Sequence, residues 1–334
     1  MTSRTLFATT LLLVTSLPLQ ANSNAANLVG KPDQWFSGDQ GKHVLSCILS
    51  WQTPNGDWPN RNTTKILFKG DRKQLSGSFA NGATTSELRT LARAARLTDD
   101  VRYKQAVVKG VDLILEAQYQ NGGWAKQHTS TDNSNRSNTF ECNCMIGLMN
   151  FLREVVTDDD FAFLDASQRT RAETAVQKAV NCILDCQVVV NGERTIWCAQ
   201  NDTDLLKPVQ QQSDQDPPLA TIESGEVLLF LMRLDDPSLE VIDAVRSGVH
   251  WFRSTKIVGH RYSRKAQKLV QDDSASPLWA RFYELETNRP IFTRLDGGPE
   301  YEIKKIDKIR RIELQWYDAC GEKVLNAYST WDHL

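Results

Sequence analysis

The feature that most constrains the fold is a repeat of about seventy residues. Three segments share an apolar pattern and begin with Ala-Val: residues 106–118, 175–187 and 244–256. A weaker copy ends at Gln52, and the equivalent ends are Gln118, Gln187 and Lys256, at steps of 66, 69 and 69 residues. Apolar residues in the 106–118 copy recur at three- and four-residue steps, which predicts an amphipathic helix. A period of this length suits two helices and long loops.

Further helices are predicted between the copies, at residues 84–97, 139–156 and 223–234. Each unit is therefore a helical hairpin, and we expect an all-α protein, an α/α toroid in which the hairpins form a ring. The loops 53–82, 119–138, 188–221 and 257–276 follow equivalent helix ends, so they should share one face that bears a groove. The next helices begin on that face, and their free N–H groups suit an anion.

The N-terminus has the form of a secretory signal peptide. Arg4 precedes an apolar run, Leu6–Leu19, which polar and small residues follow. The run is too short, and too often interrupted by threonine and serine, to favour a membrane anchor. No other apolar run is long enough to span a bilayer. We expect residues 1–26 to be the signal and residues 27–334 to form a single domain, secreted or periplasmic, that does not contact a membrane and is a monomer.

Charge and cysteine usage exclude two classes of function. The net charge is −2 and both signs are spread along the chain, so no nucleic-acid surface is expected. The seven cysteines include Cys182 and Cys186, one helical turn apart, and Cys142 and Cys144, which are too close for a metal-binding helix face. Buried small residues are favoured over a zinc site.

The long loops carry Trp58, Trp124 and Trp197 among Gly, Asn and Gln. Tryptophans that stack on sugar faces, together with helix N-termini in a broad groove, suit an extended carbohydrate. The alternative is that each tryptophan fills the core. Residues 304–316 are rich in Lys and Arg and predict a solvated charged helix. Arginines near it in the sequence can add cationic contacts to the loop face: Arg281, Arg289, Arg294, Arg310 and Arg311.

Several motifs resemble those of the pectate lyases of polysaccharide lyase family 10. In chain order they are SFANGATTSELRTLAR, NGGWAKQ, TFECNCM, WCAQND, ESGEVLLFLM, WARFYELETNRPIF and RRIELQWY. The resemblance runs from about residue 41 to the C-terminus; the WCAQ and ARFYE…TNRPIF motifs are specific, whereas a lone GGW is not. It implies an α/α-toroid enzyme that uses calcium and an arginine base to cleave polygalacturonate by anti β-elimination.

The resemblance also shows departures at charged positions. It implies an aspartate metal ligand where this chain has Ala80, and a second acidic group where it has Cys142, with Glu141 beside it. It implies a histidine at Asn201 and a substrate arginine at Gln212. The catalytic arginine falls at Leu295, one residue after Arg294. A calcium site needs six to eight oxygen ligands, and Ala80 and Cys142 supply none.

The candidate site residues follow from these matches. Arg294 is the candidate base, and Glu141 is the candidate calcium ligand. Arg281 and Arg310 match arginines that bind uronate carboxylates. The full set of candidate substrate-binding residues is Asn81, Trp124, Trp197, Arg281, Arg289 and Arg310.

Three hypotheses remain open. The first is a pectate-lyase fold that binds polygalacturonate or a related acidic polysaccharide, with cleavage impaired or lost. The second is an active lyase with a rearranged site, in which Arg294 is the base and Glu141 a ligand. The third is an exported scaffold whose loop face binds protein.

Overall fold

The computed structural model describes residues 24–128, 137–209, 217–294 and 298–333. Within these ranges the α-helices are α1 Asp33–Ser37, α2 Asp39–Ser50, α3 Thr85–Thr98, α4 Val101–Glu116, α5 Cys144–Thr157, α6 Ala166–Asp185, α7 Thr221–Leu231, α8 Leu239–Ser254, α9 Lys308–Glu313 and α10 Cys320–Ser329. The strands are β1 Ser137–Thr139, β2 Val189–Val190, β3 Glu193–Arg194, β4 Gln200–Asp202, β5 Leu219–Ala220, β6 His260–Ser263, β7 Lys268–Gln271, β8 Trp279–Ala280, β9 Phe282–Tyr283, β10 Pro290–Thr293, β11 Pro299–Glu300 and β12 Tyr317–Asp318.

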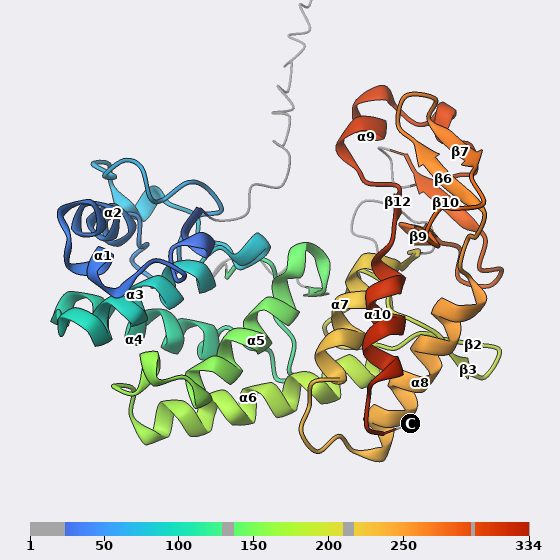
Figure 1. Cartoon of the computed structure of the whole chain (residues 1–334). Coiled ribbons are helices and arrows are strands. Elements are labelled where there is room, and N and C mark those ends of the chain that lie inside the picture. The colour runs from blue at the N-terminus through green and yellow to red at the C-terminus, as the bar shows by residue number, and fades with distance from the viewer. Residues whose placement is uncertain (1–23, 129–136, 210–216, 295–297, 334) are drawn as a thin grey trace, which may run out of the picture.

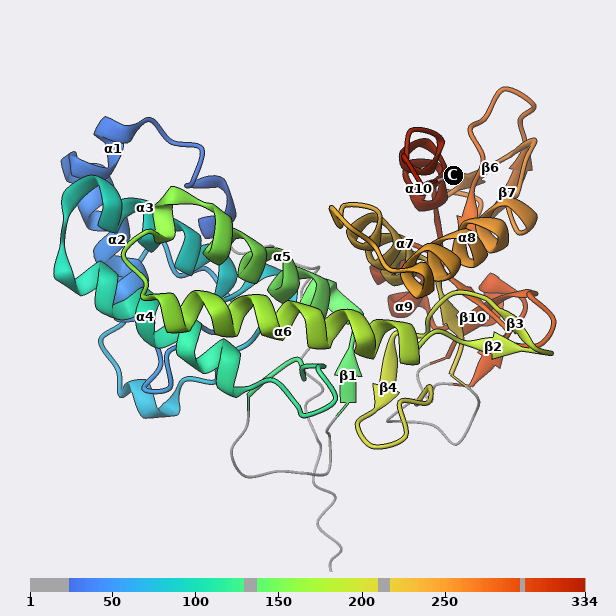
Figure 2. The same cartoon turned by 90° about the horizontal axis from the view of Figure 1, so that it is seen from below.

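Six helices form two rows. We call α4, α6 and α8, which contain the Ala-Val segments, row A, with α2 preceding them; α3, α5 and α7 form row B. Neighbouring helices touch along each row, and the rows touch through the pairs α3 with α4, α5 with α6 and α7 with α8. Both views show the rows as a curve from α1 and α2 at one end to α8 and α10 at the other (Figures 1 and 2).

Two glycines let the rows approach closely. A Cβ on Gly110 of α4 would lie 2.5 Å from the Leu88 side chain of α3, and one on Gly248 of α8 would lie 2.8 Å from the Leu228 side chain of α7. The equivalent residue of α6 is Ala179, which is fully buried. The Ala-Val motif therefore needs a small residue three positions after its valine, where the two rows pack.

The recurring glutamine links neighbouring repeats. The Gln118 side-chain amide donates to the carbonyl of Gly122 in its own loop (2.9 Å) and to that of Ala175 in α6 (2.8 Å). The same pair of bonds recurs at the other copies, from Gln52 to Gly56 and Ala106 and from Gln187 to Thr195 and Ala244. The helical acceptors are 69 residues apart, so the sequence period corresponds to a repeated contact between helices.

The predicted all-α class is wrong, because the described residues also form five small antiparallel sheets. The largest has the order β11-β10-β9-β5, and the others pair β1 with β4, β2 with β3, β6 with β7 and β8 with β12. Each strand has only two to four residues, too few to show the alternation that marks a strand in sequence. Most of them lie in the long loops after the row A helices, where we predicted no regular structure.

The C-terminal part also differs from the prediction. The expected helix over residues 304–316 is reduced to α9, and Trp316 is buried with Phe292, Ile303 and Ile306 in a small second core. The charged residues of this segment flank a buried apolar cluster, which the count of Lys and Arg concealed. With β6, β7 and β10, α9 forms a β-rich corner next to α7 and α8 (Figure 1).

The predicted signal peptide lies mainly outside the described residues, which begin at Asn24. Ala25 belongs to the short 3-10 helix η1 (Asn24–Asn27), is fully buried, and accepts a hydrogen bond from the Thr90 hydroxyl of α3. None of the helices in the described ranges is both long and apolar enough to cross a membrane.

Candidate functional site

Two similar turns introduce the first two row B helices. The 3-10 turns η3 (Ala80–Gly82) and η4 (Glu141–Asn143) precede α3 and α5, and each has a left-handed residue in the middle, Asn81 (φ 56°) and Cys142 (φ 55°). The turns pack against each other, and η4 also packs on the start of α7. The sequence motifs around Asn81 and Glu141 therefore meet at one place.

The row B helices begin without side-chain caps, unlike those of row A. Asp100, Asp165 and Ser238 cap α4, α6 and α8 by accepting a backbone N–H. No side chain caps the first turns of α3, α5 and α7. Uncapped N–H groups and the positive end of the helix dipole favour an anion beside these turns.

A buried ion pair anchors one side of the site. Arg281 Nη2 lies 2.8 Å from Glu223 Oε1 in the first turn of α7, with side-chain exposures of 13% and 4%. The backbone N–H of Thr221 donates to the Arg281 carbonyl (3.1 Å), which fixes the β8–β9 corner against the same helix end. Glu223 Oε2 and Arg281 Nε have no hydrogen-bond partner among the described residues. Both groups therefore retain capacity for a polar ligand.

Cys142 lies at the centre of a group of charged side chains. Burial raises the pKa of its thiol above the ordinary value, and the charge of Lys126 and a hydrogen bond from it oppose that rise, while Glu141 and Glu223 add to it. Glu141 Oε2 accepts a hydrogen bond from Gln200 Nε2 (3.1 Å). The site thus combines two carboxylates with two cationic groups, Lys126 and Arg281.

These residues do not fit a calcium ion. Ala80 is fully buried and offers only a methyl group, and Cys142 offers a thiol, which is a poor ligand for a hard cation. One oxygen of Glu141 is engaged by Gln200, and one of Glu223 by Arg281. No cluster of three or more His, Cys, Asp or Glu suited to a metal is present among the described residues.

The other predicted arginines lie in the β-rich corner. Arg310 donates through Nε to the Thr293 carbonyl and through Nη2 to the Thr293 hydroxyl, both at 2.7 Å. Arg294 is exposed at the end of β10, near the Glu300 carboxylate. Arg289 is also exposed and stacks over the Tyr301 ring at 3.8 Å. Leu295 and Gln212 lie outside the described residues.

Trp124 and Trp197 are buried, so neither can stack on a sugar. Both indole rings are fully buried, and each Nε1–H donates to a row A carbonyl, from Trp124 to Ile114 (2.9 Å) and from Trp197 to Ile183 (2.7 Å). Trp58 makes the equivalent bond to Ile48 (2.7 Å). The repeated tryptophan is therefore a core residue that packs at the end of the preceding helix. Trp124 and Trp197 do not belong to the candidate site.

Three polar residues of the site were not among the predicted ones: Lys126, Gln200 and Glu223. Each falls within a motif that the sequence shows, NGGWAKQ, WCAQND or ESGEVLLFLM. An acidic residue in a predicted first helical turn was a usable signal for Glu223. Nothing in the sequence alone indicated that Lys126 and Glu223 both lie near Cys142.

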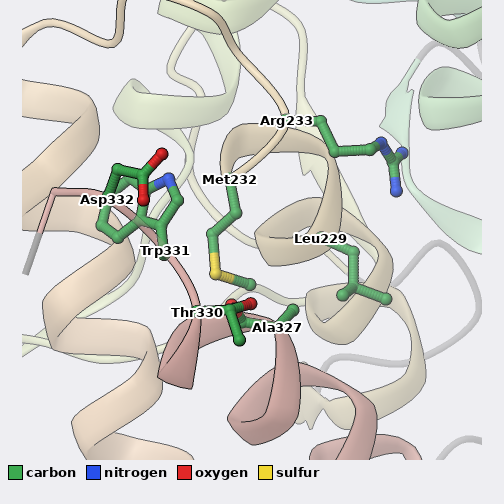
Figure 3. A pocket seen from close by; sticks show the side chains of 7 residues that line it. All are labelled: Leu229, Met232, Arg233, Ala327, Thr330, Trp331 and Asp332. Carbon is green, nitrogen blue, oxygen red and sulfur yellow. The ribbon is translucent and has the colours of Figure 1, made fainter.

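A shallow pocket lies at the opposite end of α7, between α7 and α10. Its lining residues are Leu229, Met232, Arg233, Ala327, Thr330, Trp331 and Asp332 (Figure 3). Met232 points toward Ala327 and Thr330, and the charged groups of Arg233 and Asp332 point apart. Because polar groups do not converge there, the pocket is a weaker candidate than the face around Glu223 and Arg281.

The comparisons with known proteins decide the family. A family model described as pectic acid lyase matches residues 52–325, most of the chain. This chain belongs to the pectic acid lyase family. The family 10 polysaccharide lyase from Cellvibrio cellulosa is similar in structure, with a TM-score of 0.81 and 29% identity over 94% of this chain and 98% of that chain. A search of curated protein sequences gave no match.

A second solved structure is that of a mutant of the Cellvibrio cellulosa lyase in complex with trigalacturonic acid. It has a TM-score of 0.80 and is 29% identical, over 92% of this chain and 97% of that chain. Because nearly the whole of each chain is matched, the pectic acid lyase fold extends over the helical rows and the β-rich corner alike. The family predicted from the motifs is confirmed.

Proposed function

We propose that this pectic acid lyase family member binds polygalacturonate or a related acidic polysaccharide, and that its β-elimination activity is impaired or lost. The observation that carries the proposal is the composition of the site. A buried methyl group and a thiol stand at Ala80 and Cys142, where the family resemblance implies calcium ligands, while Arg281 remains held in place by Glu223. Arg281, which can bind an anion, is kept, and the two positions Ala80 and Cys142 offer no oxygen ligand to a dication.

Binding is supported by the charges on the row B face. Arg281 has an unpartnered Nε, and the uncapped helix N-termini add N–H donors. Charge-assisted hydrogen bonds to a carboxylate are about twice as strong as neutral ones. A polymer of galacturonic acid presents one carboxylate per sugar, and one structural neighbour was solved with trigalacturonic acid.

Loss of cleavage is supported by what elimination requires. Removal of the uronate C5 proton needs a neutralised carboxylate and a base that is free of its proton. Arginine holds its proton tightly and serves as a base only where the site favours the free form, and Arg294 is exposed near the Glu300 carboxylate. An active lyase would therefore need a different base or a rearrangement around Arg294, with Glu141 recruited as a ligand.

Export to the periplasm or the medium is part of the proposal, because an acidic plant-type polysaccharide lies outside the cell. The motif at the N-terminus supports it. Since Ala25 is buried against α3, we place the start of the mature chain no later than Asn24 rather than after residue 26.

Affinity electrophoresis tests the binding proposal. The protein should be retarded in native gels that contain polygalacturonate, less at high salt, and not in gels that contain fully methyl-esterified pectin. Arg310→Ala should weaken the retardation about tenfold, in line with the loss of one charge-assisted contact. Arg311→Ala, whose guanidinium contacts Gln267, is the matched control. Equal migration in all gels would favour the protein-binding scaffold.

A further inference from the structure

The segment Ala125–Lys126 is held between the two turns of the site. The Lys126 carbonyl accepts the backbone N–H of Phe79 (2.9 Å), the residue before Ala80. The Ala125 carbonyl accepts the thiol of Cys144 (3.5 Å), two residues after Cys142. Because both turns are tied to this segment, the Lys126 side chain starts between Ala80 and Cys142.

Lys126 brings an ammonium group that no carboxylate of the described residues neutralises. None of the ion pairs formed within the described residues involves Lys126, and its side chain is exposed. Glu223, a buried carboxylate whose charge acts on Cys142, is already paired with Arg281. The positive charge of Lys126 therefore lies on an exposed side chain next to Cys142.

We propose that the Lys126 ammonium binds a uronate carboxylate between Ala80 and Cys142, in place of calcium, so that the protein binds polygalacturonate without a metal ion. This rests on the binding function proposed above. The ammonium has three donors on a flexible stem, so it can follow a carboxylate that the buried Arg281 cannot reach. A dication would be repelled by the ammonium and would find no carboxylate at Ala80 or Cys142.

The same arrangement predicts a preference for polymer with free rather than methyl-esterified carboxylates. One ammonium neutralises one carboxylate, so methyl esterification of the sugar at this position should remove the contact. Arg281 supplies the cation for a neighbouring carboxylate. Two cations, Lys126 beside Cys142 and Arg281 paired with Glu223, therefore select adjacent free carboxylates in the polymer, rather than isolated ones.

Calorimetric titration of the purified protein with trigalacturonate tests the proposal. The affinity in excess chelator should equal that in millimolar calcium. Lys126→Met should weaken binding at least about tenfold in both buffers, the loss expected for one charge-assisted contact. Lys126→Arg should retain affinity within a few-fold, because the charge is kept. Lys323→Met, on the exposed face of α10, is the control for general charge loss.

Three outcomes would overturn the proposal. Binding that requires calcium in the wild type would show that the site holds a metal after all. Equal affinities of Lys126→Met and Lys323→Met would show that Lys126 is only a solvated surface residue. Neither result touches the binding function. Absence of trigalacturonate and polygalacturonate binding in every buffer would overturn the binding function together with the proposal.

Discussion

At the scale of single residues, the site is organised by the pair Glu223 and Arg281. A buried ion pair costs desolvation, so it is weak evidence for stability, but removing one partner leaves an uncompensated charge in the interior. Glu223 has a further consequence for binding, because it fixes the guanidinium that is to meet a carboxylate. The carboxylate is therefore a positioning group, and its removal should affect both folding and binding.

We expect Glu223→Met and Arg281→Met each to lower the free energy of unfolding by about 3 kcal/mol or more. The double variant should be less destabilised than the sum of the two, because no unpaired charge remains. Urea unfolding of the four proteins measures this coupling. Single variants within about 0.5 kcal/mol of wild type, as for ordinary surface changes, would contradict the buried pair.

The buried carboxyl of Asp57 makes the stability of the folded protein depend on pH. Burial raises the pKa of its carboxyl, opposed by the Thr53 hydroxyl and by the charge of His128. The folded state therefore binds the proton more tightly than the unfolded state. The Asp57 contribution to stability is present below its unfolded pKa and is lost as the pH rises through its folded pKa.

Asp57→Asn should remove this dependence. The stability of the variant relative to wild type should increase from about pH 4, near the ordinary aspartate value, toward neutrality and then level off. Urea unfolding across that range measures it, with the exposed Asp236→Asn as control. A difference between Asp57→Asn and wild type that is constant with pH would show that folding does not change the affinity of the Asp57 carboxyl for its proton.

At the scale of elements, the contact that repeats along the chain is made by the glutamine that follows each of α2, α4 and α6. The spacing of Gln52, Gln118 and Gln187 was visible in the sequence because each helix repeats the same amphipathic pattern. Its cause was not visible, because an amide bridging to the next helix leaves no local pattern. The tryptophans show the same limit: their position after each helix was predicted, but a loop tryptophan has the same sequence signature in the core or in a groove.

Gln187→Leu tests the bridge between neighbouring repeats. The variant leaves the Thr195 carbonyl without its donor and removes the bridge to Ala244, whose carbonyl keeps its bond within α8; one unsatisfied buried group costs about 1–3 kcal/mol. We therefore expect a loss of about 2 kcal/mol or more in urea unfolding. Gln40→Leu, on the exposed start of α2, should stay close to wild type. Equal stability of the two variants would show that the Gln187 bridge between neighbouring repeats does not stabilise the fold.

At the scale of the whole molecule, the site forms where three parts of the chain meet. Rows A and B bring η3, η4 and the start of α7 together, and the β-rich corner adds Arg281. The hairpin order was predictable from the period and the family from the motifs. The all-α class failed because the strands are too short to show a pattern, and Lys126 was missed because its partners come from segments far apart in sequence. The central claim for the whole molecule is that this site binds polygalacturonate but does not cut it.

The measurement that tests this claim most directly is the absorbance of the unsaturated product that a lyase forms from polygalacturonate at alkaline pH. The protein is used at a concentration equal to that of its binding sites on the polymer. Even one turnover per molecule would then be detected. The account predicts binding with no product above the protein-free control, in calcium and in chelator alike. Product that forms in proportion to the protein concentration would contradict it, and an Arg294→Ala variant that lost this activity would identify Arg294 as the base of a working lyase.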